Sequence, residues 1–116
     1  MKKLLIILAL LLVPVQTQAR TINMGTFKLT AYCPCDECSE GWDRQTHSGH
    51  LARSGYTVAA DLSVMNIGDH ITIDGKEYRV EDCGGGVHGD HLDIFFDTHE
   101  EVEAFGVRYG EVKIWR

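Results

Sequence analysis

The sequence predicts a small, mainly β domain: a six-stranded barrel with one short helix. Apolar and polar residues alternate over several short runs, as they do in strands with one buried face. An Asp-Gly dipeptide separates two of these runs and is a strong hairpin signal. A capping box at Thr98 marks the start of a helix near the end of the chain. Because helices do not alternate with the strands, a barrel is favoured over a parallel sheet with crossover helices.

The N-terminus has the three-part pattern of a secretory signal. Lys2 and Lys3 precede an apolar run from Leu4 to Val15, and a polar stretch then ends at Ala19. The apolar run is too short to span a bilayer comfortably. We therefore expect residues 1–19 to be a signal peptide cleaved after Ala19, with an uncleaved anchor as the alternative.

The remaining chain is expected to be one exported domain. Residues 20–26 would be a short N-terminal segment, and residues 27–116 a single domain. Loss of Lys2 and Lys3 changes the formal charge from −6 to −8. Such an acidic protein is a poor partner for nucleic acid or an anionic membrane, whereas a largely neutral glycan is not repelled. We expect a secreted monomer with no stable membrane insertion after cleavage.

The first four strands follow from alternation and turn signals. Residues 27–32 alternate and predict a half-buried strand. Residues 34–55 are polar and rich in glycine, so they predict a long loop, which in a small domain is usually functional or disordered. Residues 56–60 predict a second strand. Residues 70–73 and 76–80 flank the Asp-Gly turn and predict a hairpin.

The last third of the chain predicts two strands and the helix. Residues 91–97 alternate and predict a strand. The helix starts at Thr98 and stops at Gly106. Residues 107–115 predict a final strand, bent at Gly110.

The cysteines suggest that disulfide bonds or a bound metal ion stabilise the domain. The candidates are Cys33, Cys35, Cys38 and Cys83, three of them within one short loop segment. Export favours disulfides, and a small core benefits from them, so we expect disulfides of unknown pairing. Four thiolates could instead hold one zinc ion, although the pattern of two CxxC pairs is absent. Free thiols are the third possibility, and no other cofactor is expected.

Three aspartates are the candidates for chemistry. Asp61, Asp82 and Asp93 each end or interrupt an apolar, strand-like run, which can bring them into one cleft. Carboxylates held close together cannot all ionise cheaply, so the pKa of one rises. Asp93 is the preferred acid because it lies within a strand, where Phe95 on the same face would add desolvation. A protonated carboxyl group is what glycosidic cleavage requires of its acid; the alternative is a solvent-facing strand residue.

A glycine-rich turn over residues 84–89 lies between two of these aspartates. It lacks the lysine and hydroxyl residue of a phosphate loop. Gly84 and Gly85 would form a tight turn and let a sugar ring approach the backbone. His88 sits inside the turn, where an ordinary surface histidine is a more frequent case than a ligand.

These patterns together resemble the 3D domain, a family named for three aspartates. The resemblance covers roughly Phe27 to Trp115 and rests on the order and spacing of six pieces: Phe27–Tyr32, Val58–Asp61, Glu81–Gly85, Gly89, Leu92–Phe96 and Gly106. The Cys-Pro-Cys-x-x-Cys loop, together with Glu-Asp-Cys-Gly-Gly, is similar to a cysteine-bearing subgroup often seen in phages and Gram-positive bacteria.

The resemblance implies a double-psi β-barrel, shared with the membrane-bound lytic transglycosylase A family. It implies cleavage of the β-1,4 bond between N-acetylmuramic acid and N-acetylglucosamine in peptidoglycan, with a 1,6-anhydro product. Asp93 matches the family's acid and base. Asp82 and Asp61 match the second and first aspartates, and Thr30 and Tyr32 match residues that line the cleft.

Two departures and two alternatives remain open. His88 stands where the family often has a lysine, and residues 62–68 lack the family's common prolines. Because one fold can serve several functions, a non-catalytic glycan-binding module that loosens the wall is the first alternative. A structural part of a phage or surface assembly is the second.

Overall fold

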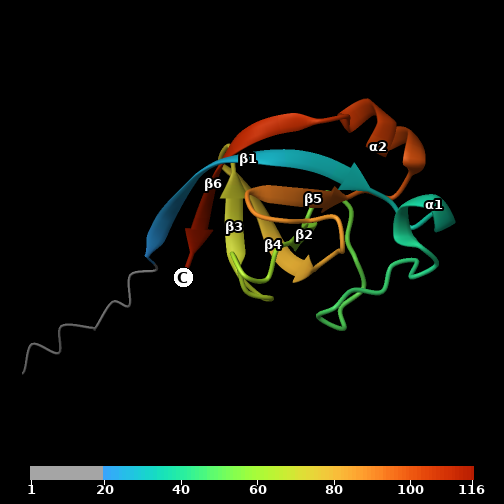
Figure 1. Ribbon diagram of the computed structural model, residues 1–116, viewed down its shortest axis with the longest axis horizontal. Helices are drawn as coiled ribbons and strands as arrows, with labels where there is room; N and C mark the ends of the chain where they lie inside the picture. Colours follow the sequence, from blue (N-terminus) through green and yellow to red (C-terminus); the bar gives the residue numbers. More distant parts are fainter. Residues whose placement is uncertain (1–19) are drawn as a thin grey trace, which may run out of the picture.

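Six strands close into a barrel, and two short helices lie at one end of it (Figure 1). The computed structural model describes residues 20–116, so the predicted signal peptide at 1–19 lies outside the described residues. The elements are β1 (Thr21–Tyr32), α1 (Asp36–Ser39), β2 (Thr57–Ala60), β3 (His70–Ile73), β4 (Lys76–Asp82), β5 (His91–Phe95), α2 (His99–Phe105) and β6 (Arg108–Trp115). No helix among these residues is long and apolar enough to cross a membrane.

The strand order around the barrel is β1-β5-β2-β4-β3-β6. β1 pairs with β5 and β2 with β4 in parallel, and the other neighbours are antiparallel. Closure removes the exposed edges that an open sheet of this size would leave. The predicted six-stranded barrel is therefore confirmed. Asp93 of β5 lies opposite Thr30 of β1 on one side and Ala59 of β2 on the other.

The core explains the alternation seen in the sequence. Every strand contributes inward-facing apolar side chains, as does the segment between β2 and β3, and together they form one cluster: Phe27, Leu29, Val58, Ala60, Met65, Ile71, Ile73, Tyr78, Val80, Leu92, Ile94, Val112 and Ile114. Burying one such large side chain contributes roughly 1.5–3 kcal/mol. Since strand side chains alternate between faces, Leu92 and Ile94 in the core place Asp93 on the outer face.

The turn and capping predictions are also confirmed. Asp74 and Gly75 have φ angles of 48° and 84°, the positive values that a tight two-residue hairpin turn requires. The Thr98 side chain accepts a hydrogen bond from the backbone N–H of Glu101, which fixes the start of α2.

Two elements differ from the prediction. β1 begins at Thr21 rather than residue 27, because residues 21–26 pair with β6, with an irregularity beside Gly25. Local alternation does not reveal such pairing with a distant partner. The expected loop at 34–55 also contains α1, a helix of four residues with no side-chain cap at its start.

Candidate active site

A cavity of about 590 Å³ lies against the outer face of the barrel wall. The strands contribute Tyr32, Ala59, Asp82, His91 and Asp93, and two loops over residues 38–47 and 83–87 complete the lining. The chain after α1 runs beside the carboxyl ends of β1 and β5 (Figure 1). The predicted long loop is therefore one wall of the cavity.

Asp93 is half-buried at the centre of β5 and lines this cavity. Burial raises the pKa of its carboxyl group, and the negative charge of Asp82 adds to the rise. A hydrogen bond from the Thr30 hydroxyl and the charge of His91 act in the opposite direction. The pKa of Asp93 is therefore above its ordinary value, as predicted, but the dominant cause is burial rather than a cluster of acids.

A chain of two hydrogen bonds leads to Asp93. The Thr30 hydroxyl donates to Asp93 Oδ1 at 2.9 Å and lies 2.7 Å from His91 Nε2. A hydroxyl has a single proton to donate, so Thr30 must accept from His91, whose proton is then on Nε2. These two contacts fix the Asp93 carboxylate against β1 through its Oδ1 atom.

Asp82 connects three parts of the cavity wall. The Tyr32 hydroxyl donates to Asp82 Oδ2 at 3.0 Å. The backbone N–H groups of His47 and Cys83 donate to Oδ1 at 3.2 and 2.9 Å. Burial, and then the charge of Asp82, raises the pKa of the Tyr32 phenol. The phenol therefore keeps its proton and remains a hydrogen-bond donor.

Asp61 is not among the residues that line the cavity. It accepts hydrogen bonds from the backbone N–H of Gly89 at 2.8 Å and from both the N–H and the hydroxyl of Ser63 at 2.9 and 2.7 Å. The hydrogen bonds from Gly89 and Ser63 lower the pKa of Asp61 to about 2. The expectation that three carboxylates share one cleft is thus met by Asp82 and Asp93 only. Asp61 instead ties down the end of the glycine-rich turn.

The other predicted residues divide between the cavity and its surroundings. Tyr32, Gly84 and Gly85 line the cavity. Thr30 contacts the site through its hydrogen bond to Asp93. His88 is exposed and outside the lining, and its charge contributes to the lowered pKa of Asp61.

Several lining residues were missed by sequence reasoning, and His91 and Trp42 are two of them. His91 shares a strand face with Asp93, a position that period-two alternation could have indicated. Trp42 lies in the long loop with 66% of its surface exposed, and an aromatic residue within a polar loop was an available signal. Both add functional groups suited to a polar, ring-shaped ligand.

The long loop is held in place against the barrel. The backbone N–H of Ser48 donates to the carbonyl of Glu81 at 3.0 Å. The Arg44 guanidinium group pairs with Asp97 at 2.7 Å and lies 5.4 Å from the centre of the Phe95 ring. Phe95 is fully buried, and its ring packs edge-on against Tyr32 with the ring centroids 5.2 Å apart.

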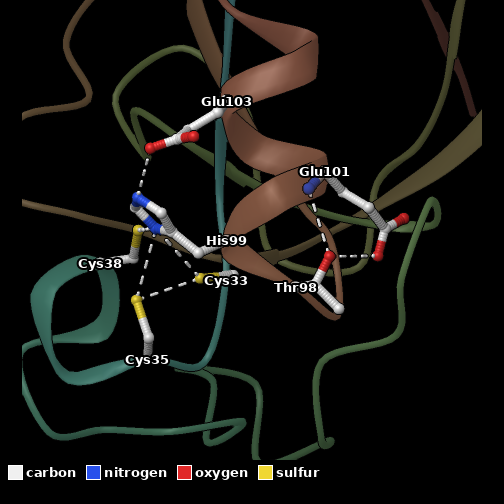
Figure 2. A network of polar contacts seen from close by, with 7 residues as sticks. All are labelled: Cys33, Cys35, Cys38, Thr98, His99, Glu101 and Glu103. Carbon is white, nitrogen blue, oxygen red and sulfur yellow. Dashed lines mark hydrogen bonds and ion pairs between the residues drawn. The ribbon is translucent and has the colours of Figure 1, made fainter.

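The cysteine predictions require correction. Among residues 20–116 all four thiols are free, and Cys33 Sγ and Cys35 Sγ lie 3.1 Å apart, well beyond a disulfide bond of about 2.05 Å. Cys33, Cys35 and Cys38 instead converge on Nδ1 of His99, at 3.7, 3.6 and 3.5 Å (Figure 2).

The fourth member of this cluster is therefore His99 and not Cys83. Cys83 follows β4 and lies in the cavity wall, on the glycine-rich turn. His99 is the first residue of α2 and comes 61 residues after Cys38, so no local spacing pattern could have indicated it.

Comparisons with known proteins agree with the architecture. The crystal structure of MltA from E. coli superimposes with a TM-score of 0.56 and 19% identity, over 62% of this chain and 27% of that chain. A structure of an E. coli lytic transglycosylase MltA variant in an apo form gives the same values. A third, described as revealing a unique lytic transglycosylase fold, has a TM-score of 0.55.

At this level of identity the likeness shows a shared fold, and the chain spans only 27% of the length of MltA. No curated protein matches the chain. The protein family described as "3D domain" matches residues 56–116, which include Asp61, Asp82 and Asp93. Because this match covers more than half of the 116 residues, we conclude that the chain belongs to the 3D-domain family.

Proposed function

We propose that this protein is a peptidoglycan lytic transglycosylase. It would cleave the β-1,4 bond between N-acetylmuramic acid and N-acetylglucosamine and leave a 1,6-anhydro product. The observation that carries the proposal is the half-buried Asp93, whose pKa is raised and which lines a cavity able to admit sugar rings. Membership of the 3D-domain family and the fold shared with MltA support it.

One carboxyl group is sufficient for this reaction. The Asp93 carboxyl group first donates its proton to the glycosidic oxygen as the bond to the anomeric carbon breaks. The C6 hydroxyl of the same muramic acid residue then attacks that carbon, and Asp93 takes the hydroxyl proton. The tethered hydroxyl gains the large effective concentration of an intramolecular nucleophile, so no second carboxylate is needed to activate water.

Asp82 would act as an electrostatic partner. Its negative charge raises the pKa of Asp93, and the same field would favour the positive charge that develops on the sugar ring. Its hydrogen bond from Tyr32 holds the phenol at the cavity wall. Asp82 is thus expected to tune the acid and stabilise the transition state without transferring a proton.

The cavity wall offers two features that suit a glycan strand. The exposed Trp42 indole presents a flat apolar face, on which a sugar ring can stack. Gly84 and Gly85 have no side chains, so a sugar can approach the backbone there. Both features would serve binding rather than proton transfer.

The signal-like N-terminus supports action outside the cytoplasm, in turnover of the cell wall. The direct test is mass spectrometry of purified peptidoglycan after incubation with the protein. We expect anhydro-muropeptides, and Asp93→Asn as the control should release none. Muropeptides with only reducing ends would identify a hydrolase. Retention of the protein on peptidoglycan without any product would identify a binding module.

A further inference from the structure

A second cluster of reactive side chains lies beside the cavity, where the end of β1, α1 and the start of α2 meet (Figure 2). Its members are Cys33, Cys35, Cys38 and His99. Each offers one sulfur or nitrogen atom, and these four atoms lie within 4.8 Å of one another. The proposed glycosidic reaction uses none of them.

The distances within the cluster match a tetrahedral metal site. Zinc bonds of about 2.3 Å to sulfur and about 2.05 Å to nitrogen, at tetrahedral angles, place sulfur about 3.6 Å from nitrogen. The three cysteine sulfurs lie 3.7, 3.6 and 3.5 Å from His99 Nδ1. The Cys33–Cys35 sulfur separation of 3.1 Å is shorter than the tetrahedral value of about 3.8 Å, and a small opening would accommodate the ion.

The surroundings of His99 are those of a metal ligand. Its second ring nitrogen, Nε2, lies 3.4 Å from Glu103 Oε1, one turn further along α2. A carboxylate on the second nitrogen orients the imidazole and strengthens the first nitrogen as a donor. The Thr98 cap fixes the start of α2, so the position of the ring is set by the backbone as well (Figure 2).

We propose that Cys33, Cys35, Cys38 and His99 bind one structural zinc ion. Three thiolates and one imidazole are soft and borderline ligands, which favour zinc over hard cations such as magnesium or calcium. Four protein ligands fill the tetrahedral shell and leave no open position, as in structural rather than catalytic zinc sites. Binding exchanges the thiol protons for the metal ion, so no redox reagent is required.

The zinc ion would fix the N-terminal end of the segment that forms one wall of the cavity. Cys38 belongs to α1 and lines the cavity, and the loop that follows α1 carries Trp42. The other end of that segment is fixed by the hydrogen bonds of His47 and Ser48 to β4. Zinc would therefore order the segment between these two points, without touching Asp93.

The test is metal analysis of the full chain, purified without added metal, by native mass spectrometry and elemental analysis. We expect one zinc ion per chain, and loss of it in Cys38→Ser and His99→Ala. Cys83→Ser is the matched control, since it removes a thiol that lies outside the cluster, and it should retain zinc. His99→Cys should also retain zinc, because it restores a fourth soft ligand.

A second measurement separates metal loss from misfolding. Removing zinc from the wild-type protein with a chelator should speed hydrogen exchange in residues 36–43 and leave the exchange of β3, β4 and β6 unchanged. Re-addition of zinc should reverse the change. A wild-type protein that binds no zinc, or a zinc content lost in Cys83→Ser but kept in His99→Ala, would overturn the assignment. Neither result depends on whether the protein cleaves glycans.

Discussion

The Asp93 carboxyl group accepts a hydrogen bond from Thr30, lies in the field of Asp82, and is half-buried against the barrel. Burial is the largest cause of its raised pKa. Asp61, by contrast, is satisfied by donors from Ser63 and Gly89 and has a pKa of about 2. In the sequence, both aspartates end or interrupt an apolar, strand-like run. Their different roles depend on neighbours that only the folded chain brings together.

Replacing Asp93 by asparagine should stabilise the protein at neutral pH. The pKa of Asp93 is higher in the folded than in the unfolded state, so its stabilising contribution is present below the unfolded value of about 3.9 and is lost as pH rises through the folded value. Asparagine carries no such charge and can still accept from Thr30. Urea unfolding should show a higher free energy of unfolding for the variant at neutral pH, with the difference shrinking below a pH of about 4. A variant that is less stable than wild type at neutral pH would contradict this assignment.

Replacing Asp82 by asparagine should shift the pH dependence of cleavage. The acid must be protonated, so activity falls as pH rises through the pKa of Asp93. Removing the charge of Asp82 lowers that pKa, and the falling limb of the pH–rate profile should move to lower pH. Asp61→Asn is the matched control and should leave the limb in place, since Asp61 does not line the cavity. Equal shifts in the two variants would show that Asp61 also acts on Asp93.

Asp61→Asn should instead weaken the glycine-rich turn. The folded pKa of Asp61 is about 2, below the unfolded value, so its contribution is present above a pH of about 4 and is lost as pH falls through about 2. The melting temperature of the variant should be lower than that of wild type at neutral pH, and the gap should close near pH 2. The temperature difference would be measured by circular dichroism. A gap that stays constant with pH would mean that the charge of Asp61 is not involved.

At the scale of elements, the packing of β6 depends on the close approach of the Ile73 and Leu29 side chains to Gly110. A Cβ atom there would lie 2.9 Å from Ile73 Cγ2 and 3.1 Å from Leu29 Cδ1, inside the barrel core. The Gly110→Ala variant should therefore lose on the order of 1–3 kcal/mol of stability through overpacking. Gly86→Ala is the control, because its Cβ would meet nothing within 4 Å, and its change should stay within about 0.5 kcal/mol. Chemical denaturation of both variants measures the difference, and equal losses would argue against a steric cause.

At the scale of the whole molecule, local patterns predicted most of the barrel and part of the site. Alternation gave the strands, and the Asp-Gly turn and the Thr98 cap gave the boundaries of the hairpin and of α2. Contacts between distant segments were not predictable in the same way. The early start of β1 depends on β6, and the role of His99 depends on α2 packing beside the cysteine loop.

The fold also explains why the candidate site residues lie together on one part of the barrel wall. The parallel pairing of β1 with β5 sets Thr30 beside Asp93, and β4 ends at Asp82 in the same wall. The long loop then covers these strand ends and brings Trp42 to the cavity. The proposed acid, its electrostatic partner and the proposed sugar platform thus come from three separate stretches of the chain: β5, β4 and the long loop.

The measurement that most directly tests the central claim is the rate of anhydro-muropeptide release by Asp93→Asn, compared with Asp82→Asn and wild type. General acid–base catalysis typically contributes on the order of 10²–10⁴ in rate, and Asp93 is the sole proposed proton donor, so the loss should lie at the upper end of that range. Binding to peptidoglycan should be largely retained, because asparagine preserves the shape of the side chain. Near-normal release by Asp93→Asn, with all activity lost in Asp82→Asn, would contradict the assignment of Asp93 as the acid.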